Sequence, residues 1–177
     1  MMENPVLFSE KQKFRQWWIW IILLTLNGFF LFGIYVQVIG GKQFGDKPMS
    51  DGGLIFSALM LLFITLLIAR FQLETVLKKD GMYVRFFPFL FKFKFYPWKD
   101  ISRIYIRQYS PIKEYGGWGI RFGIFGSGKA YNISGNYGIQ IIFTDDKKLL
   151  LGTQMPQQWE DSLKNIKIMN SEGYIQQ

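Results

Sequence analysis

The sequence predicts a membrane helical hairpin followed by a mainly-β domain that one C-terminal amphipathic helix closes. Three observations support this fold class: two long apolar stretches near the N-terminus, a series of short alternating segments after them, and a last segment with helical spacing. The chain has 177 residues and a formal net charge of +8. Its polar part, residues 72–177, has the size of one domain with a single core.

Residues 17–39 and 52–71 are the predicted membrane spans, and residues 40–51 form the loop between them. The first stretch carries no charge and, at about 1.5 Å per residue, is long enough to cross a hydrocarbon core of about 30 Å. The second is long enough if Arg70 reaches toward the interface. The first stretch is also too long for the apolar part of a cleaved signal peptide. We therefore expect a hairpin of two spanning helices.

Polar residues are few inside the spans, and Asn27 lies near the middle of the first one. We expect its amide to bond across the hairpin or between copies of the chain, rather than to line a conduction path. Neither span has a charged residue near its middle, so the sequence does not indicate a transporter or a pump.

Lysine and arginine residues are distributed unequally around the spans. Three lie in the N-terminal segment 1–16, two lie in the loop, and Arg70, Lys78 and Lys79 follow the second span. This distribution favours both termini, and the domain, in the cytoplasm.

Short segments that alternate between apolar and polar residues predict about seven or eight antiparallel strands. Phe93, for example, lies between Lys92 and Lys94, and the Asp145–Asp146 pair indicates a turn between two such segments. The predicted strands cover residues 73–78, 82–87, 91–96, 103–107, 119–125, 129–134, 138–144 and 148–153.

The spacing changes from Pro156 onward. Trp159, Leu163 and Ile166 recur about one helical turn apart, with acidic residues early and basic residues late, as the helix dipole prefers. We expect one amphipathic helix of about 12 residues that covers an open end or face of the sheet.

Several kinds of chemistry are not expected of this chain. Cysteine and histidine are absent, which removes disulfides, the common zinc ligands and the usual general base. The stretch from Gly123 to Ala130 has the glycines and the lysine of a phosphate-binding loop, but lacks the Ser or Thr that follows and has a strand pattern where a helix is needed. We interpret it as a glycine hairpin. No enzyme activity, cofactor or metal site is expected.

The order of these elements resembles a known family. The residues from Asp80 to Tyr83 at the first hairpin, those from Pro97 to Ile101 before a strand, the glycine-rich run and the closing helix are similar to those of bacterial membrane-anchored proteins with a pleckstrin-homology-like (PH-like) domain after a two-helix hairpin. The resemblance covers essentially the whole chain. It implies a partly open antiparallel β-barrel of about seven strands closed by the C-terminal helix, a location in the bacterial inner membrane, and no enzyme activity.

A segment over residues 109–119 is the longest one without a strand pattern, and loops of this kind often carry binding groups. Tyr115 and Trp118 offer apolar contacts, and Lys113 and Arg121 can meet an acidic group. We expect a protein partner or a second copy of the chain to bind here. In the alternative interpretation, Trp118 only plugs an end of the barrel.

Anionic lipid headgroups are the alternative ligand. Residues 70–129 hold 12 basic and 4 acidic residues, and a basic domain next to a bilayer is attracted to anionic lipid. Lys78, Lys79 and Arg85 lie in and around the first hairpin, where the resemblance places headgroup ligands, although Tyr83 stands where that pattern needs a basic residue. These residues could equally be a solvated face. Nucleic acid is not expected, because no nucleic-acid-binding motif accompanies the charge.

Overall fold

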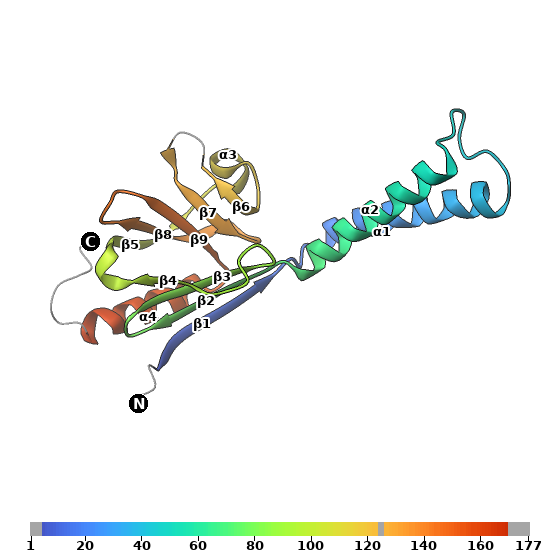
Figure 1. Cartoon of the computed structure of the whole chain (residues 1–177). Helices are drawn as coiled ribbons and strands as arrows, with labels where there is room; N and C mark the ends of the chain where they lie inside the picture. Colours follow the sequence, from blue (N-terminus) through green and yellow to red (C-terminus); the bar gives the residue numbers. More distant parts are fainter. Residues whose placement is uncertain (1–4, 124–125, 170–177) are drawn as a thin grey trace. The chain divides into compact units, whose positions relative to one another are not determined.

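The computed structural model describes residues 5–123 and 126–169, and it divides the chain into two compact units. The hairpin unit comprises residues 15–70. The β unit combines the residues on both sides of it, through residue 14 and from residue 71 onward. The described residues form the strands and helices labelled in Figure 1.

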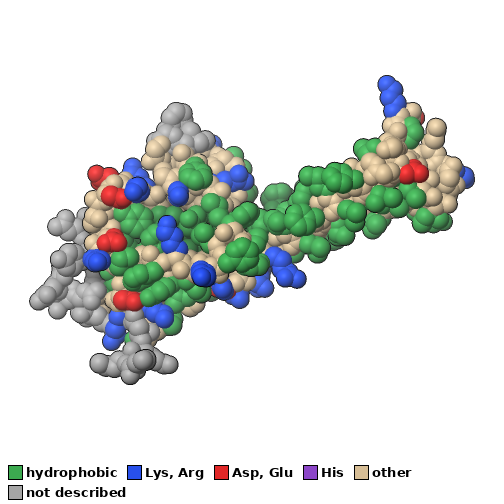
Figure 2. All heavy atoms as spheres, in the orientation of Figure 1, with side chains coloured by type: hydrophobic (Ala, Val, Ile, Leu, Met, Phe, Trp, Pro, Cys, Tyr) green, Lys and Arg blue, Asp and Glu red, His purple; other side chains and the backbone are tan. Residues whose placement is uncertain are grey.

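In the hairpin unit, α1 (Trp17–Ile34) continues into a π-helical turn over Tyr35–Ile39, and α2 (Asp51–Arg70) returns. Both helices are long and apolar enough to cross a membrane. Figure 2 shows apolar side chains over much of their surface, as is typical of helices that face lipid.

The two helices of the hairpin unit are joined by a side-chain hydrogen bond. The Nδ2 atom of Asn27 donates to Oγ1 of Thr65 at 2.9 Å. The expected bond across the hairpin is therefore confirmed, and it links α1 to α2 where no water is expected to compete.

The β unit has two sheets. Sheet A is antiparallel, in the order β1-β2-β3-β4, and sheet B has the order β5-β8-β9-β7-β6 with one parallel pair, β7 and β9. The strands of sheet A are β1 (Val6–Lys13), β2 (Gln72–Lys78), β3 (Gly81–Phe87) and β4 (Lys94–Pro97). Those of sheet B are β5 (Ile101–Gln108), β6 (Gly119–Phe122), β7 (Lys129–Asn132), β8 (Tyr137–Phe143) and β9 (Lys148–Thr153).

The helix-plus-β layout agrees with the sequence, but three details differ. The described strands do not close into a barrel, and the β7–β9 pair is parallel, so the sheets are not purely antiparallel. The segment 91–96 is a strand only from Lys94, because the residues before it form a loop. The end of the predicted strand 119–125 and the chain after Met169 lie outside the described residues.

β1 belongs to the β unit, although the sequence pattern assigns residues 1–16 to a separate N-terminal segment and begins the domain at residue 72. It pairs with β2 from Val6 opposite Lys78 to Lys13 opposite Gln72. Its inward-facing residues are Phe8, Glu10 and Gln12. Because two of these three are polar, the strand does not show the apolar alternation by which strands are recognised.

One apolar cluster fills the space between the two sheets. α4 (Pro156–Met169) completes it, as the spacing of its apolar residues predicts. Trp159 is 1% exposed and its ring lies 5.1 Å from that of Phe8, measured between centroids. A short helix, α3 (Pro111–Tyr115), and a 3-10 turn (Trp98–Asp100) complete the described elements.

Candidate binding site

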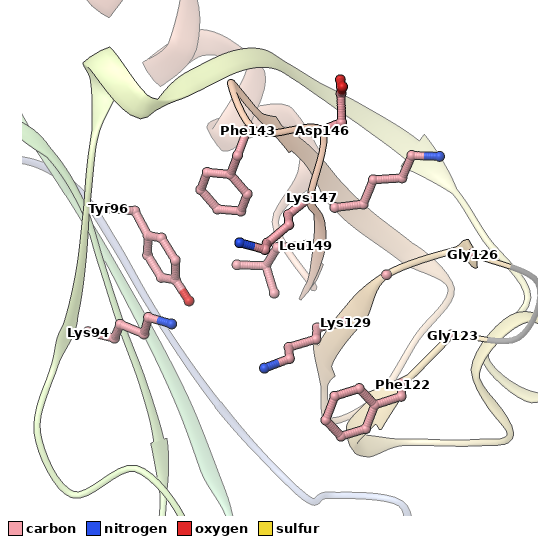
Figure 3. A pocket seen from close by; sticks show the side chains of 12 residues that line it. Lys94, Tyr96, Phe122, Gly123, Gly126, Lys129, Phe143, Asp146, Lys147 and Leu149 are labelled. Atoms are coloured by element: carbon pink, nitrogen blue, oxygen red, sulfur yellow. The ribbon is translucent and has the colours of Figure 1, made fainter.

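A pocket of about 450 Å³ opens between the β4 edge of sheet A and the β6, β7 and β8–β9 parts of sheet B. Figure 3 shows its lining. The lining residues are Lys94, Tyr96, Phe122, Gly123, Gly126, Gly128, Lys129, Phe143, Asp146, Lys147, Lys148 and Leu149.

The floor of the pocket is apolar and mostly aromatic. Tyr96 and Leu149 are buried, and the ring of Tyr96 stacks on that of Phe143 with centroids 5.4 Å apart. Burial raises the pKa of Tyr96 well above its ordinary value, so its hydroxyl stays neutral at physiological pH. A flat apolar group of a ligand can pack against this floor.

Two lysines from different sheets hold their charged ends over aromatic rings of the pocket lining. The Nζ atom of Lys94 lies 5.1 Å from the centroid of the Tyr96 ring, and that of Lys129 lies 5.2 Å from the centroid of the Phe122 ring. Figure 3 shows both ammonium groups reaching into the same space. Among the described residues, neither has a carboxylate within 4.0 Å. Both charges are therefore available to an anion.

Strand geometry explains why these lysines face the pocket. Lys94 and Tyr96 are two residues apart in β4 and so lie on the same face of the strand. Lys129 begins β7 opposite Leu149 of β9. Gly128, with φ of +80°, permits this close approach, because a Cβ atom there would lie 2.3 Å from the carbonyl oxygen of Lys148.

The other charges at the rim are partly neutralised. Lys147 Nζ lies 2.6 Å from Asp145 Oδ2, and this bond raises the pKa of the Lys147 ammonium and lowers that of the carboxyl group. Asp146 and Lys148 also line the pocket. The rim therefore carries more positive than negative charge, and Lys94 and Lys129 are the rim charges that lie over aromatic rings. The arrangement suits the binding of an anion that carries an apolar group.

The structure brings together only part of the site predicted on residues 109–119. Tyr115 is 2% exposed, and its hydroxyl donates to the backbone oxygen of Ser127 at 3.2 Å. Trp118 and Arg121 are neighbours, since Arg121 Nε donates to the Trp118 carbonyl oxygen at 2.9 Å. Lys113 is exposed on α3. The ring of Tyr115 is therefore part of the interior, whereas Lys113, Trp118 and Arg121 reach the surface.

α3 is fixed to sheet B by an ion pair. Arg107 Nη2 lies 2.8 Å from Glu114 Oε2, and the second oxygen of Glu114 accepts the backbone N–H of Ser110 at 2.7 Å. The bond from Arg107 lowers the pKa of Glu114. This segment is thus an ordered part of the fold.

The three residues of the lipid hypothesis do not form one patch. Lys78 pairs with Gly81, and Arg85 pairs with Glu74, four positions along β2. At about 3.3 Å per residue this places Lys78 and Arg85 about 13 Å apart along the strands. Arg85 is also engaged by Glu74 through a salt bridge. Lys79 is exposed in the turn.

Sequence reasoning did not single out Lys94 and Lys129. Lys129 closes the glycine stretch that was interpreted as a hairpin, and it starts a strand rather than a helix. Lys94 belongs to an alternating segment in which every second residue is a lysine or a phenylalanine. Their meeting depends on the packing of the two sheets, which no local pattern encodes. Comparisons with protein-family models and with curated proteins found no match.

Proposed function

We propose that this protein is a membrane-anchored binding module without enzyme activity, and that the pocket takes an anionic ligand with an apolar part. The observation that carries the proposal is the pair Lys94 and Lys129, whose ammonium groups have no described acidic partner and lie over an aromatic floor. A ligand that pairs with these ammonium groups and also covers the apolar surface gains binding free energy from both contacts. A phosphate or carboxylate on a ring or a short hydrocarbon has this chemistry.

The proposed location is the bacterial inner membrane, with α1 and α2 as a spanning hairpin and both termini in the cytoplasm. The apolar surfaces of the helices and the basic residues that flank them support this. The pairing of Lys13 with Gln72 adds support, because strands that precede α1 and follow α2 can pair only if they lie on the same side of the membrane.

The proposed fold family is that of PH-like domains. The series of short strands before one C-terminal helix that covers the core supports this proposal. β1, which reaches the domain from before the hairpin, and the parallel β7–β9 pair depart from the antiparallel barrel that the resemblance implies.

A protein partner or a second copy of the chain is the second candidate ligand, bound at Lys113, Trp118 and Arg121. The observation in its favour is that Ile112, which directly precedes Lys113 on α3, is 66% exposed. An apolar side chain amid charged ones is common in the contact surfaces of proteins.

The pocket proposal is tested by calorimetric titration of the full-length protein in nanodiscs of uncharged lipid. The probe is 2-naphthyl phosphate, and the two controls are 2-naphthol, which lacks the charge, and inorganic phosphate, which lacks the rings. We expect only the probe to bind well, since either half alone satisfies only the floor or only the lysines.

The matching variants are Lys94→Ala with Lys129→Ala, and Lys99→Ala with Arg103→Ala, which remove the same charge outside the pocket. The first pair should weaken probe binding at least about tenfold, because each charge-assisted contact contributes about 1.5 kcal/mol or more. The second pair should leave it unchanged. Equal losses in the two double variants would show unspecific attraction and contradict the proposal, as would the absence of binding to the wild-type chain.

A further inference from the structure

The loop between β3 and β4, residues 88–93, exposes three phenylalanines. Phe89 is 56% exposed, Phe91 is 70% exposed and Phe93 is 41% exposed. Scattered apolar residues are common on protein surfaces, but three large exposed aromatic side chains within one six-residue loop are a concentration that such scatter does not explain. None of these three rings lines the pocket described above.

The loop presents these rings from an ordered backbone. The backbone N–H of Leu90 donates to the Phe86 oxygen at 2.7 Å. The ring of Phe91 packs edge-on against Phe87 with centroids 5.5 Å apart, and the guanidinium of Arg85 lies 4.6 Å from the centroid of the Phe93 ring. The outward rings are thus held in place, so exposing them does not depend on local unfolding.

The loop lies at the end of sheet A where the chain enters and leaves the hairpin unit. Gln72 is paired both with Lys13, near the end of β1, and with Phe87, the last residue of β3. Figure 1 shows the β3–β4 loop at the end of the sheet where β1 finishes and β2 starts. The 88–93 loop, the end of β1 and the start of β2 therefore lie at the same end of sheet A.

Aromatic contacts connect the loop to the residues that adjoin the helices. Phe71, which directly follows the last residue of α2, lies 5.3 Å from Phe89 and 5.7 Å from Phe14, measured between ring centroids. Phe14 precedes α1 by a few residues. Phe14 and Phe71 thus lie in the chain that flanks the two apolar helices, and the ring of Phe89 packs against Phe71.

The charge of this region suits an anionic bilayer surface. Between Gly81 and Lys99 the chain has four basic residues and no acidic one. Lys92, between Phe91 and Phe93, is exposed and can place its ammonium group at headgroup level while the rings enter the interface. Basic residues near such a surface are attracted to anionic lipids.

We infer that the 88–93 loop is a membrane-interface anchor, in which Phe89, Phe91 and Phe93 insert at the boundary between headgroups and acyl chains. This inference rests on the proposed membrane hairpin. With the two helix connections, the loop is a third point of attachment, and it fixes which side of sheet A faces the bilayer.

The test uses single cysteines, which the native chain lacks entirely. Phe91→Cys, Ile112→Cys and Ile22→Cys are each labelled with the fluorophore NBD in the full-length protein, reconstituted in vesicles of phosphatidylcholine and phosphatidylglycerol. Ile112, at 66% exposed, is the matched control on the β unit, and Ile22, at 51% exposed, reports on α1. Quenching is measured with lipids that carry a doxyl group near the headgroup and, separately, with aqueous iodide.

We expect the Phe91 label to be quenched several-fold more strongly by doxyl lipid than the Ile112 label, and to be protected from iodide. If iodide quenches the Phe91 and Ile112 labels equally while doxyl lipid quenches the Ile22 label, the inference of an anchor is wrong and the hairpin proposal stands. If iodide also quenches the Ile22 label, the hairpin proposal fails, and the inference of an anchor fails with it. A Phe91 label shielded from both quenchers would indicate a protein contact and would also overturn the inference.

Discussion

The two edges of sheet A meet sheet B in opposite ways. At the β1 edge, the buried carboxylate of Glu10 accepts hydrogen bonds from Thr153 Oγ1 at 2.7 Å, from the backbone N–H of Gln154 at 2.7 Å and from Trp159 Nε1 at 2.9 Å. At the β4 edge, the ammonium groups of Lys94 and Lys129 border an open pocket. A charge that the chain itself satisfies stabilises the fold, whereas a charge left unsatisfied is available to a ligand.

The β1 edge also shows how firmly the N-terminus is built into the domain. Gln12 Nε2 donates to the Gly152 oxygen at 2.6 Å, and Phe8 packs on Trp159. β1 therefore contacts β2, β9 and α4. Among the described residues, the β4 edge is joined to sheet B by fewer side-chain hydrogen bonds, such as the one between the hydroxyls of Tyr96 and Tyr131.

The largest effect is expected from removing β1. A chain of residues 71–169 alone should fail to unfold cooperatively, because β2 loses one of its two partner strands and Trp159 loses both Phe8 and Glu10. A chain in which Asn-Gly joins residues 5–14 to residues 71–169 should fold, because Phe14 and Phe71 directly adjoin the paired residues Lys13 and Gln72 and their rings lie 5.7 Å apart, so a two-residue turn can connect them. Thermal unfolding followed by circular dichroism compares the two chains. Equal cooperative transitions in both would show that β1 is dispensable.

A smaller loss is expected from Glu10→Gln. The side chain keeps its shape but loses the charge that three donors share. One of its two oxygens also becomes an amide nitrogen, which cannot accept the hydrogen bonds that this oxygen received. The free energy of unfolding should fall by about 2 kcal/mol, measured by urea unfolding of the full-length protein. Glu160→Gln, on the exposed surface of α4, is the control and should change little. An unchanged stability of Glu10→Gln would mean that these bonds contribute nothing net.

The smallest effect concerns the outer face of sheet A, where Glu74 bonds to Lys11 and Arg85. Burial raises the pKa of Glu74, but the hydrogen bonds from Lys11 and Arg85 outweigh it and lower the pKa below its ordinary value. A carboxyl group with a lowered pKa in the folded state stabilises the fold above its unfolded pKa, about 4.3, and loses this contribution as the pH falls through the folded value.

Glu74→Gln should therefore lower the urea midpoint at pH 6, and the difference from wild type should shrink as the pH falls below about 4.3. Urea unfolding at pH 6, 4 and 3 measures it. A difference that stays constant over this range would show that the two basic partners do not act through the charge of Glu74.

Local patterns predict much of this fold, and the reasons for the failures are physical. The apolar helices, the strand pairs β2–β3 and β8–β9, and α4 are encoded in residue spacing that is readable over a few turns or strands. β1 is not, because Glu10 and Gln12 face inward where apolar residues are expected. The parallel β7–β9 pair joins strands that a third strand separates in the sequence, and parallel pairs carry no turn signal.

The candidate site was less predictable than the fold. The loop pattern predicts Tyr115 as an apolar contact residue, but aromatic residues in loops are as suited to filling the interior, and in the structure the ring is buried. Lys94 and Lys129 come from different sheets, so their proximity arises only when the sheets pack. Charge counts indicated an anionic ligand, and only the structure shows which of the lysines lie together over aromatic rings.

The contrast between the two edges is tested most directly by the shift that a ligand causes in the unfolding midpoint. Wild type, Glu10→Gln and the Lys94→Ala, Lys129→Ala double variant are unfolded with and without 2-naphthyl phosphate, which at about 100 times its Kd stabilises a binding-competent fold by about 2.7 kcal/mol. We predict that Glu10→Gln starts lower and keeps the full shift, while the double variant starts near wild type and loses it. A double variant that keeps the shift, or a Glu10→Gln variant that loses it, would contradict the assignment of the β1 edge to stability and the β4 edge to binding.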